Sequence, residues 1–465
     1  MKNLSDLRLL KETLLSLNGL IIYEDILQDK TISDFCRLLA SITAEHLDRK
    51  EIWQAYFKFF RDMLGKSWPS YIVRCLLHSR NIFAEQASSR KSNGIDPMIR
   101  QSVFWDLAIL QKLAAIKPSQ LKTLIATRFS NSDDYDEDWT ANWPEWDTGR
   151  EIAEGKPSGF NELKTSLNAQ QWLLAFRNQI IQKFLSGDSW STPENFQILA
   201  DFYRQAGCGI LAEYAAFRVR DEGPVLEGIE NPDSIMINNL FCQEREQAII
   251  IKNTESFLKG YPANNIILYG SRGTGKSSLV KALLNEYVAQ GLRLIQLRKN
   301  QIKYFPEIAR NLENSCLKFI FFIDDLSFSE EDNDYRDVKS LLEGGIAARP
   351  QNVLIYVTTN RRHFVKESFS ERCNDDVHAM DNIDEKLSLA DRFGITVTFL
   401  SPDQESYLKI VEGLAQQSGI EIDQQLLRQR ALEWVMMHNS RSGRTAKQFI
   451  DSLKAELAEN KTENV

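Results

Sequence analysis

One octapeptide of this 465-residue chain has the residue types and spacing needed to bind phosphate. It fits the pattern G-x-x-x-x-G-K-[ST] and consists of Gly270, Ser271, Arg272, Gly273, Thr274, Gly275, Lys276 and Ser277. Its glycines let the backbone curl so that successive N–H groups point at phosphate oxygens, and the helix that follows adds its positive end. We expect this cradle to extend to Ser278, with Lys276 on the β- and γ-phosphates and the Ser277 hydroxyl on Mg²⁺.

Two further segments place acid and amide side chains at the ends of apolar runs. Asp324 and Asp325 directly follow 319–323, and Asn360 follows 353–357 after two threonines. With a phosphate loop upstream, we expect Asp324 to hold Mg²⁺ and Asp325 to orient the attacking water and accept its proton. Asn360 would fix the same water or a phosphate oxygen. The structural alternatives are acids that end a buried strand and an amide that caps a turn.

Two arginines are candidates for binding an anion. Arg392 precedes the apolar run 395–399, and Arg444 opens the last helix that the sequence predicts. An arginine at a helix N-terminus opposes the helix dipole, which favours an anionic partner for Arg444. The alternative for both residues is an ordinary surface ion pair, which contributes little stability.

The elements that position these residues follow from the hydrophobic pattern. Short apolar runs alternate with helical segments, at 265–269, 292–297, 319–323, 353–357 and 395–399. Runs that are apolar throughout are typical of parallel strands buried on both faces. The pattern predicts an α/β domain with a doubly wound, parallel, five-stranded sheet over residues 226–400.

Helical periodicity flanks this domain on both sides. In residues 1–225, apolar residues recur at spacings of three and four, which predicts an all-α N-terminal domain with a partner-binding or regulatory role. Residues 401–465 predict a small helical lid. Its helices are expected to start at Ser401, Asp423 and Ser442, whose side chains suit helix N-termini.

The overall composition excludes several classes of protein. Hydrophobic residues make up 43% of the chain and charged residues 26%, which is typical of a globular protein and excludes general disorder. Every apolar run is far below the roughly 18 residues that span a bilayer. The N-terminus has no apolar signal core, and the six cysteines show no close pairing. We therefore expect a cytoplasmic protein with reduced thiols and no membrane partner.

Much of the net charge of −8 lies in one segment. Residues 131–151 contain eight acids and one base, so the remainder is close to neutral and no global basic field attracts nucleic acid. Nucleic acid stays possible through local pairs such as Arg361-Arg362 and Arg298-Lys299, although such pairs are more often solvated surface. The tryptophan-rich stretch 133–147 is either a solvated loop whose tryptophans pack on the domain or a docking element for a partner.

Taken together, these motifs resemble the AAA+ class of P-loop ATPases. The segments that carry the resemblance occur in the order GSRGTGKS (270–277), FIFFIDD (319–325), VTTN (357–360), ADRFG (390–394) and SGRTA (442–446). Within that class, the chain resembles the bacterial domain-of-unknown-function family 815 of predicted ATPases. The resemblance covers residues 226–457, half of the chain, and leaves the N-terminal region without a counterpart.

The resemblance implies roles for individual residues. Lys276 and Ser277 match the Walker A ligands, Asp324 and Asp325 match the Walker B pair, and Asn360 and Arg444 match sensors 1 and 2. Arg392 matches the arginine finger, which reaches the nucleotide of a neighbouring subunit and so implies a homo-oligomer, either a ring or a dimer. Most AAA+ enzymes have glutamate at the position of Asp325. The shorter side chain predicts slow hydrolysis.

Two functions are open from the sequence. The first is an ATPase that uses ATP and Mg²⁺ to drive a conformational change on a protein or nucleic-acid partner, with an unknown protein bound by the N-terminal helices. The second is a nucleotide-gated binding module with little turnover, which the short Asp325 suggests. A GTPase or small-molecule kinase is disfavoured, because the segment 359–362 lacks the aspartate of the guanine-reading motif N/T-K-x-D.

Overall fold

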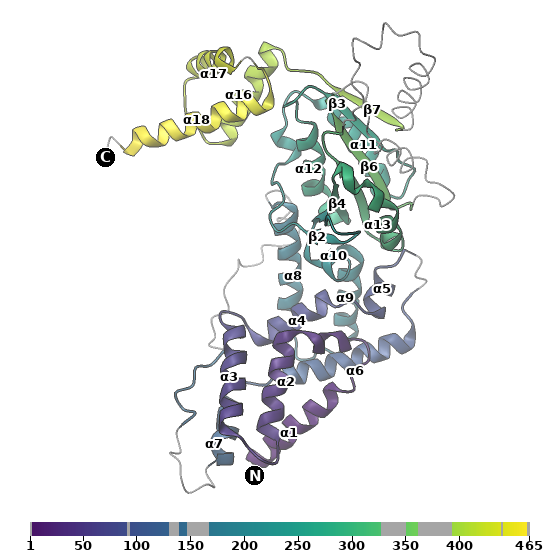
Figure 1. Cartoon of the computed structure of the whole chain (residues 1–465), viewed down its shortest axis with the longest axis vertical. Helices are drawn as coiled ribbons and strands as arrows, with labels where there is room; N and C mark the ends of the chain where they lie inside the picture. Colours follow the sequence, from purple (N-terminus) through teal and green to yellow (C-terminus); the bar gives the residue numbers. More distant parts are fainter. Residues whose placement is uncertain are drawn as a thin grey trace. The chain divides into compact units, whose positions relative to one another are not determined.

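The computed structural model describes residues 2–90, 94–129, 139–146, 167–326, 350–360, 393–438 and 440–462. The chain divides into two compact units, Met1–Thr165 with Leu173–Glu213 and Ser166–Trp172 with Tyr214–Val465. We call the first the helical unit and the second the sheet unit, and Figure 1 labels their elements. Among the described residues, no helix combines the length and apolar character needed to cross a membrane.

The helical unit consists of amphipathic helices, as the spacing of apolar residues predicts. They are α1 (Lys2–Leu17), η1 (Glu24–Gln28), α2 (Lys30–Thr43), α3 (Arg49–Met63), α4 (Trp68–His78), α5 (Ile82–Ala87), α6 (Pro97–Ala114), α7 (Pro118–Phe129), α8 (Ala169–Ser186, whose first four residues belong to the sheet unit), α9 (Pro193–Ala206) and α10 (Ile210–Glu213). Asp29 and Asp48 begin α2 and α3 by accepting hydrogen bonds from backbone N–H groups of the first turn. Phe35, Phe59 and Trp68 are fully buried between these helices.

Two tryptophans of the acidic stretch pack into the helical unit. Trp143 and Trp146 are 7% and 5% exposed, and their ring centroids lie 4.7 and 5.2 Å from that of Tyr56. Residues 139–146 therefore follow the first of the two interpretations, in which the tryptophans pack on their own domain. The acidic residues at 133–138 lie outside the described part of the chain.

Seven strands of the described residues form one sheet. They are β1 (Ala216–Val219), β2 (Leu226–Gly228), β3 (Ile266–Gly270), β4 (Leu292–Leu297), β5 (Lys318–Ile323), β6 (Val353–Thr359) and β7 (Ile395–Phe399). Their order is β2-β1-β4-β5-β6-β3-β7, in which β1 and β2 are antiparallel and every other neighbouring pair is parallel. All five predicted strands are confirmed, and so is their parallel arrangement.

The sheet is larger than the five strands predicted. β1 and β2 extend the edge beyond β4, and the expected domain boundary between residues 225 and 226 falls inside this hairpin. β1 has four residues and β2 has three, so neither is long enough to show a strand pattern. What places β1 in the sheet is its pairing with β4, which joins Ala216 to Leu294.

Further helices lie in the described part of the sheet unit before the lid. They are η3 (Ile237–Asn239), α11 (Glu244–Leu258), α12 (Lys276–Tyr287), η4 (Val288–Gln290), η5 (Lys299–Tyr304) and α13 (Phe305–Leu312). Every residue of β5 and β6 is buried, as expected for central strands that are covered on both faces. These two strands and β3 therefore form a rigid base for the residues that follow their carboxyl ends.

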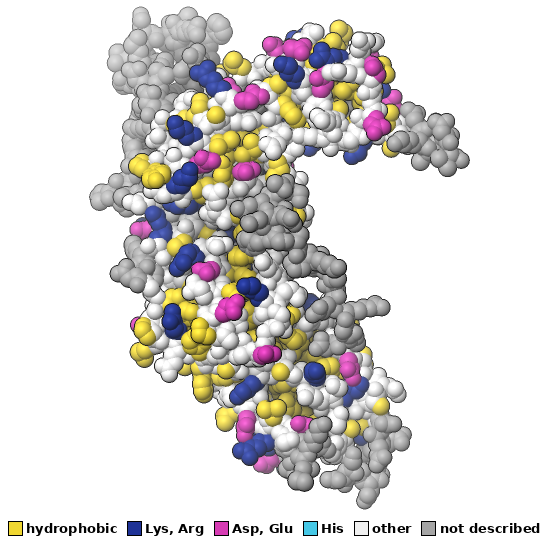
Figure 2. Space-filling view, turned by 180° about the vertical axis from the view of Figure 1, so that it is seen from behind, with side chains coloured by type: hydrophobic (Ala, Val, Ile, Leu, Met, Phe, Trp, Pro, Cys, Tyr) yellow, Lys and Arg dark blue, Asp and Glu magenta, His cyan; other side chains and the backbone are white. Residues whose placement is uncertain are grey.

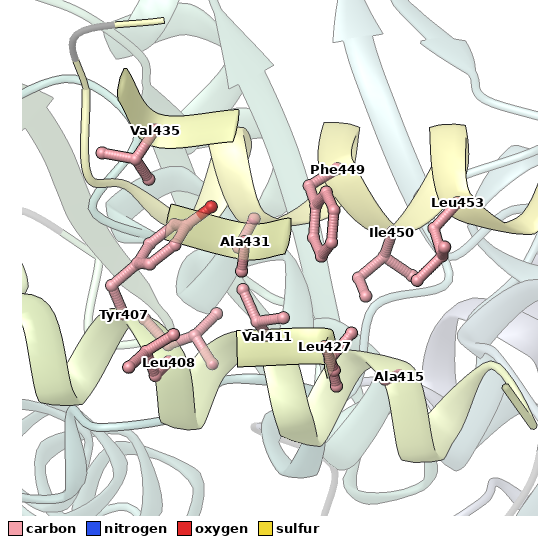
Figure 3. Packing of buried hydrophobic residues seen from close by; sticks show 12 residues of the cluster. Tyr407, Leu408, Val411, Ala415, Leu427, Ala431, Val435, Phe449, Ile450 and Leu453 are labelled. Atoms are coloured by element: carbon pink, nitrogen blue, oxygen red, sulfur yellow. The ribbon is translucent and has the colours of Figure 1, made fainter. Parts of the chain in front are cut away.

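The lid is a three-helix cluster with its own core. Its helices are α16 (Gln404–Gln417), α17 (Gln424–His438) and α18 (Gly443–Thr462). The side chains of Val411, Ala431 and Phe449 come from the three different helices and meet in this core (Figure 3). The cluster accounts for the amphipathic pattern of the last 65 residues, because each helix buries one face against the other two.

Two of the three predicted lid-helix starts are confirmed. The carboxylate of Asp423 accepts the N–H of Leu426 at 3.0 Å, and the hydroxyl of Ser442 accepts the N–H of Thr445 at 3.1 Å. The first start differs, because α16 is capped by Asp403 and not by Ser401. Asp403 directly precedes the first helical residue, so its carboxylate reaches the N–H groups of the first turn.

Candidate functional site

β3 carries the predicted phosphate-binding loop, called the phosphate loop below, to the carboxyl edge of the sheet. Gly270 ends β3, Lys276 begins α12, and residues 271–275 connect them. Gly273 and Gly275 have φ values of +78° and +86°, which lie in the left-handed region that favours glycine. Because β3 lies between β6 and β7, whereas the chain continues from β3 to the distant β4, the loop is at a topological switch point, where α/β sheets bind ligands.

The lysine of the loop is buried and has three oxygen acceptors. Lys276 is 6% exposed, and its Nζ donates to the carbonyl oxygens of Gly270 and Ser271 at 2.7 Å and to Asn360 Oδ1 at 3.0 Å. Burial lowers the pKa of Lys276, and the carboxylates of Asp325 and Asp324 oppose that shift. An ammonium group placed in this way interacts strongly with negative charge, because little water screens it.

The two carboxylates that follow β5 lie beside the loop and are exposed. Asp324 Oδ1 accepts a hydrogen bond from Ser277 Oγ at 2.6 Å, and Asp325 Oδ1 accepts one from Asn360 Nδ2 at 2.5 Å. Asn360 therefore bridges the loop to the second carboxylate, with its amide oxygen on Lys276 and its amide nitrogen on Asp325. The structure brings these five residues, predicted from three separate segments, together at one edge of the sheet.

The pair Ser277 and Asp324 has the chemistry of a magnesium site. A hydroxyl and a carboxylate are hard oxygen ligands, which Mg²⁺ prefers, and it takes its other ligands from phosphate oxygens and water. Because the two side chains already contact each other next to the phosphate loop, both could ligate one ion there. When bound, such an ion would neutralise charge on the phosphates.

The remaining residues of the motif have distinct surroundings. Ser271 and Arg272 are exposed at the outer bend of the loop, and Ser278 is half-buried in the first turn of α12. The Thr274 hydroxyl donates to the carbonyl oxygen of Ser271 at 2.9 Å, which closes the bend. A Cβ atom on Gly270 would collide with the carbonyl oxygen of Phe399 on β7.

The lid contacts the loop through the start of α18. The N–H of Gly443 donates to the carbonyl oxygen of Gly273 at 3.0 Å. A Cβ atom on Gly273 would lie 2.8 Å from Ser442 Oγ and 3.5 Å from Arg444 Cβ. Arg444 is therefore next to the phosphate loop. Arg392, the other predicted arginine, lies outside the described residues.

Sequence reasoning missed a second residue outside the loop that contacts it. Gln243 directly precedes α11, and its Nε2 donates to the carbonyl oxygen of Thr274. Two residues earlier, the ring of Phe241 packs so closely on α16 that a Cβ atom on Gly413 would collide with it. No sequence signal marks Gln243, because its partner is a backbone carbonyl group.

Comparison with known proteins gives one family match. A family model described as "Protein of unknown function (DUF815)" matches residues 212–457, which is more than half of the chain. This range includes all seven strands of the sheet, the phosphate loop and most of the lid. The helical unit before residue 212 lies outside the match.

Individual relatives are distant. The chromosomal replication initiator protein DnaA of Streptococcus mutans serotype c (strain ATCC 700610 / UA159) is 24% identical over 205 residues, which is 42% of this chain and 42% of that protein. The match thus spans less than half the length of that relative. Among solved structures, the Thermotoga maritima RuvB Holliday junction branch migration motor is 13% identical with a TM-score of 0.29, and covers 47% of this chain and 72% of its own. AMPPCP-bound DnaA from Aquifex aeolicus is 18% identical with a TM-score of 0.33, and covers 48% and 65%.

Proposed function

We propose that this chain, which belongs to the DUF815 family, is a P-loop ATPase of the AAA+ class that hydrolyses ATP with Mg²⁺ to drive a conformational change on a partner. The observation that carries the proposal is the network in which Asn360 joins Lys276 to Asp325. It connects the carboxyl ends of β3, β5 and β6, the strands that converge on the phosphate loop.

The side chains of this network suit the attack of water on a γ-phosphate. Lys276 would exchange its present oxygen acceptors for phosphate oxygens and stabilise the charge that develops on them. The carboxylate of Asp325 would accept the proton of the attacking water, and Asn360, which contacts it, would orient that water. Ser277 and Asp324 would hold the Mg²⁺ ion.

The phosphate loop would transmit the conformational change from the nucleotide site to the elements around it. Its carbonyl groups accept hydrogen bonds from Gly443 of the lid and from Gln243 before α11, so a shift of the loop on nucleotide binding or phosphate release would pull on both. Arg444, beside the loop, would contact the nucleotide. We further propose that Arg392 acts on the nucleotide of a neighbouring subunit in a cytoplasmic homo-oligomer, either a ring or a dimer.

The proposed partner is a protein bound by the helical unit. On the face of the molecule that Figure 2 shows, lysine and arginine side chains are interspersed with aspartate and glutamate side chains across the described surface. A surface that binds nucleic acid instead concentrates lysine and arginine along the phosphate backbone. On this face of the molecule, the charge distribution therefore favours a protein partner over nucleic acid.

The proposal is tested with purified full-length protein. We expect Mg²⁺-dependent ATP turnover, with ATP bound in preference to GTP, and a fall in kcat of about 100-fold or more in Lys276→Ala, because the substitution removes the charge that faces the phosphates. The matched control is Lys281→Ala on the same helix, whose ammonium forms a surface ion pair with Asp233 at 3.3 Å. Wild-type protein that binds no ATP, or turnover that survives in Lys276→Ala, would refute the proposal.

A second function, a nucleotide-gated binding module with little turnover, is favoured by one observation. Asp325 is one methylene shorter than the usual glutamate, and its carboxylate contacts Asn360 at 2.5 Å. Wild-type protein that binds ATP and captures its protein partner in an ATP-dependent way, without measurable hydrolysis, would support this second function in place of the first.

A further inference from the structure

Thr358 contacts all three of the described residues that follow β5, Asp324, Asp325 and Leu326. Its hydroxyl donates to Asp324 Oδ1 at 2.5 Å and accepts the N–H of Asp325 at 2.8 Å. Its carbonyl oxygen accepts the N–H of Leu326, also at 2.8 Å. One residue on β6 therefore holds both carboxylate-bearing residues and the residue after them.

This turn departs from regular strand geometry. Asp325 has a φ value of +53°, a left-handed conformation that residues other than glycine rarely adopt. The pairing of β5 with β6 ends at Ile323 and Val357, so the sheet ladder offers no acceptor for the N–H of Asp325. The Thr358 hydroxyl is that acceptor. Because Thr358 is 1% exposed, water does not compete for its hydroxyl.

The polarity of the hydroxyl suits both contacts. A threonine hydroxyl has one proton and two lone pairs, so it can donate to Asp324 while it accepts from Asp325. Asp324 Oδ1 also accepts the hydrogen bond of Ser277 at 2.6 Å. Two donors on the same oxygen fix the orientation of this carboxylate toward the phosphate loop.

From this geometry we infer that Thr358 is a positioning residue for ATP hydrolysis, which acts through the two aspartates. Its hydroxyl orients Asp324, which would hold the Mg²⁺ ion, and keeps Asp325 in the conformation that directs its carboxylate to Asn360. Thr358 itself touches no reacting atom. The inference rests on the proposed function, because it concerns how the same hydrolytic site is held in place.

The test replaces the hydroxyl with a methyl group of similar size. In Thr358→Val we expect kcat for ATP to fall by about 10- to 100-fold, since two hydrogen bonds to the aspartates are lost. The KM for ATP in the presence of Mg²⁺ should rise no more than severalfold, because the phosphate loop is intact and only the support of Asp324 is lost. Thr358→Ser retains the hydroxyl and should restore kcat. If Thr358→Val does not give folded protein, Thr358→Ala removes the same hydroxyl without a new methyl group and is judged by the same criteria.

A binding measurement distinguishes positioning from a merely structural role. Titration calorimetry with a non-hydrolysable ATP analogue, once with Mg²⁺ and once with EDTA, gives the affinity that the ion adds. We expect Thr358→Val to reduce this added affinity severalfold and to leave the affinity in EDTA unchanged. Thr254→Val is the matched control: its fully buried hydroxyl contacts the carbonyl oxygen of Ile250 and the hydroxyl of Tyr356, both at 2.8 Å. It should lower stability while kcat and the added affinity stay at wild-type values.

Several results would overturn the inference. The inference is wrong if Thr358→Val has the kcat of the wild type and the same gain in nucleotide affinity from Mg²⁺. It is also wrong if kcat falls in Thr358→Val and Thr358→Ser does not restore it. The same holds if Thr254→Val loses as much kcat as Thr358→Val does. Wild-type protein that binds no ATP is a different failure, because it removes the proposed function and this inference together.

Discussion

Asp325 is the residue on which the rate of the proposed reaction depends most directly. Its carboxylate is exposed at the end of β5 and contacts Asn360, while its backbone is in the left-handed region. Aspartate and asparagine tolerate this backbone conformation better than longer side chains do. At the scale of single residues, the shorter acid therefore agrees with the turn that Thr358 holds, and need not indicate a defective site.

Two substitutions of Asp325 test this argument. We expect Asp325→Asn, which cannot accept a proton, to lower kcat by about 100-fold and to keep ATP binding. Asp325→Glu should lower kcat by about tenfold, because the longer side chain displaces Asn360 and fits the left-handed backbone less well. Steady-state turnover and calorimetry measure both effects. A large rise in kcat in Asp325→Glu would contradict the prediction and support the nucleotide-gated module.

At the scale of elements, the important fit is between the phosphate loop and the start of α18. Gly273 has no side chain to keep the lid away from the loop. Its carbonyl oxygen accepts a hydrogen bond from the N–H of Gly443. Ser442, which caps α18, is 5% exposed and lies directly against Gly273. The phosphate motif therefore needs glycine here for two reasons, the backbone conformation of the loop and the close approach of the lid.

We expect Gly273→Ala to weaken ATP binding by at least about tenfold and to destabilise the sheet unit by about 1–3 kcal/mol. The added Cβ atom would lie 2.8 Å from Ser442 Oγ in a residue with a φ value of +78°. Calorimetry and urea unfolding measure the two effects. Gly419→Ala is the control, because Gly419 also has a positive φ value, +64°, but has open space around it. Equal losses of ATP affinity in both variants would show that the contact with the lid does not matter.

At the scale of the whole molecule, the chain combines a sheet unit that carries the proposed nucleotide site with a helical unit that has its own core. The family match begins at residue 212, two residues before Tyr214, where the longer segment of the sheet unit begins, and so leaves nearly all of the helical unit outside. A nucleotide site with a separate binding unit suits an ATPase that acts on a partner. The proposed arginine finger, Arg392, adds the requirement for a second subunit.

An assembly whose sites are shared between subunits has a clear signature. We expect ATP turnover per chain to rise with protein concentration, and Arg392→Ala to lower it by about 1,000-fold. A mixture of Arg392→Ala with Lys276→Ala should regain part of the activity, because one variant has an intact nucleotide site and the other an intact arginine. Turnover per chain that is independent of concentration, with an inactive mixture, would contradict the shared site.

Much of the site was predictable from the sequence because its signals are local. The phosphate motif occupies eight consecutive residues, and Asp324, Asp325 and Asn360 each follow an apolar run that forms a buried strand. Parallel strands bring their carboxyl ends to one edge of a sheet, so the runs alone imply that these side chains meet. The five central strands and the helical lid were predictable for the same reason, because each has its own periodic pattern.

Only the tertiary structure decided the contacts that hold the site together. In the sequence, Thr358 looks like an ordinary strand residue, and its contacts with the aspartates exist only because β6 lies beside β5. Gln243 and Gly443 donate hydrogen bonds to carbonyl groups of the loop, which no sequence pattern marks. Likewise, β1 and β2 belong to the sheet only because β1 pairs with β4. Hydrogen bonds between distant segments depend on the distance and direction of two groups in space, and hydrophobic periodicity describes neither.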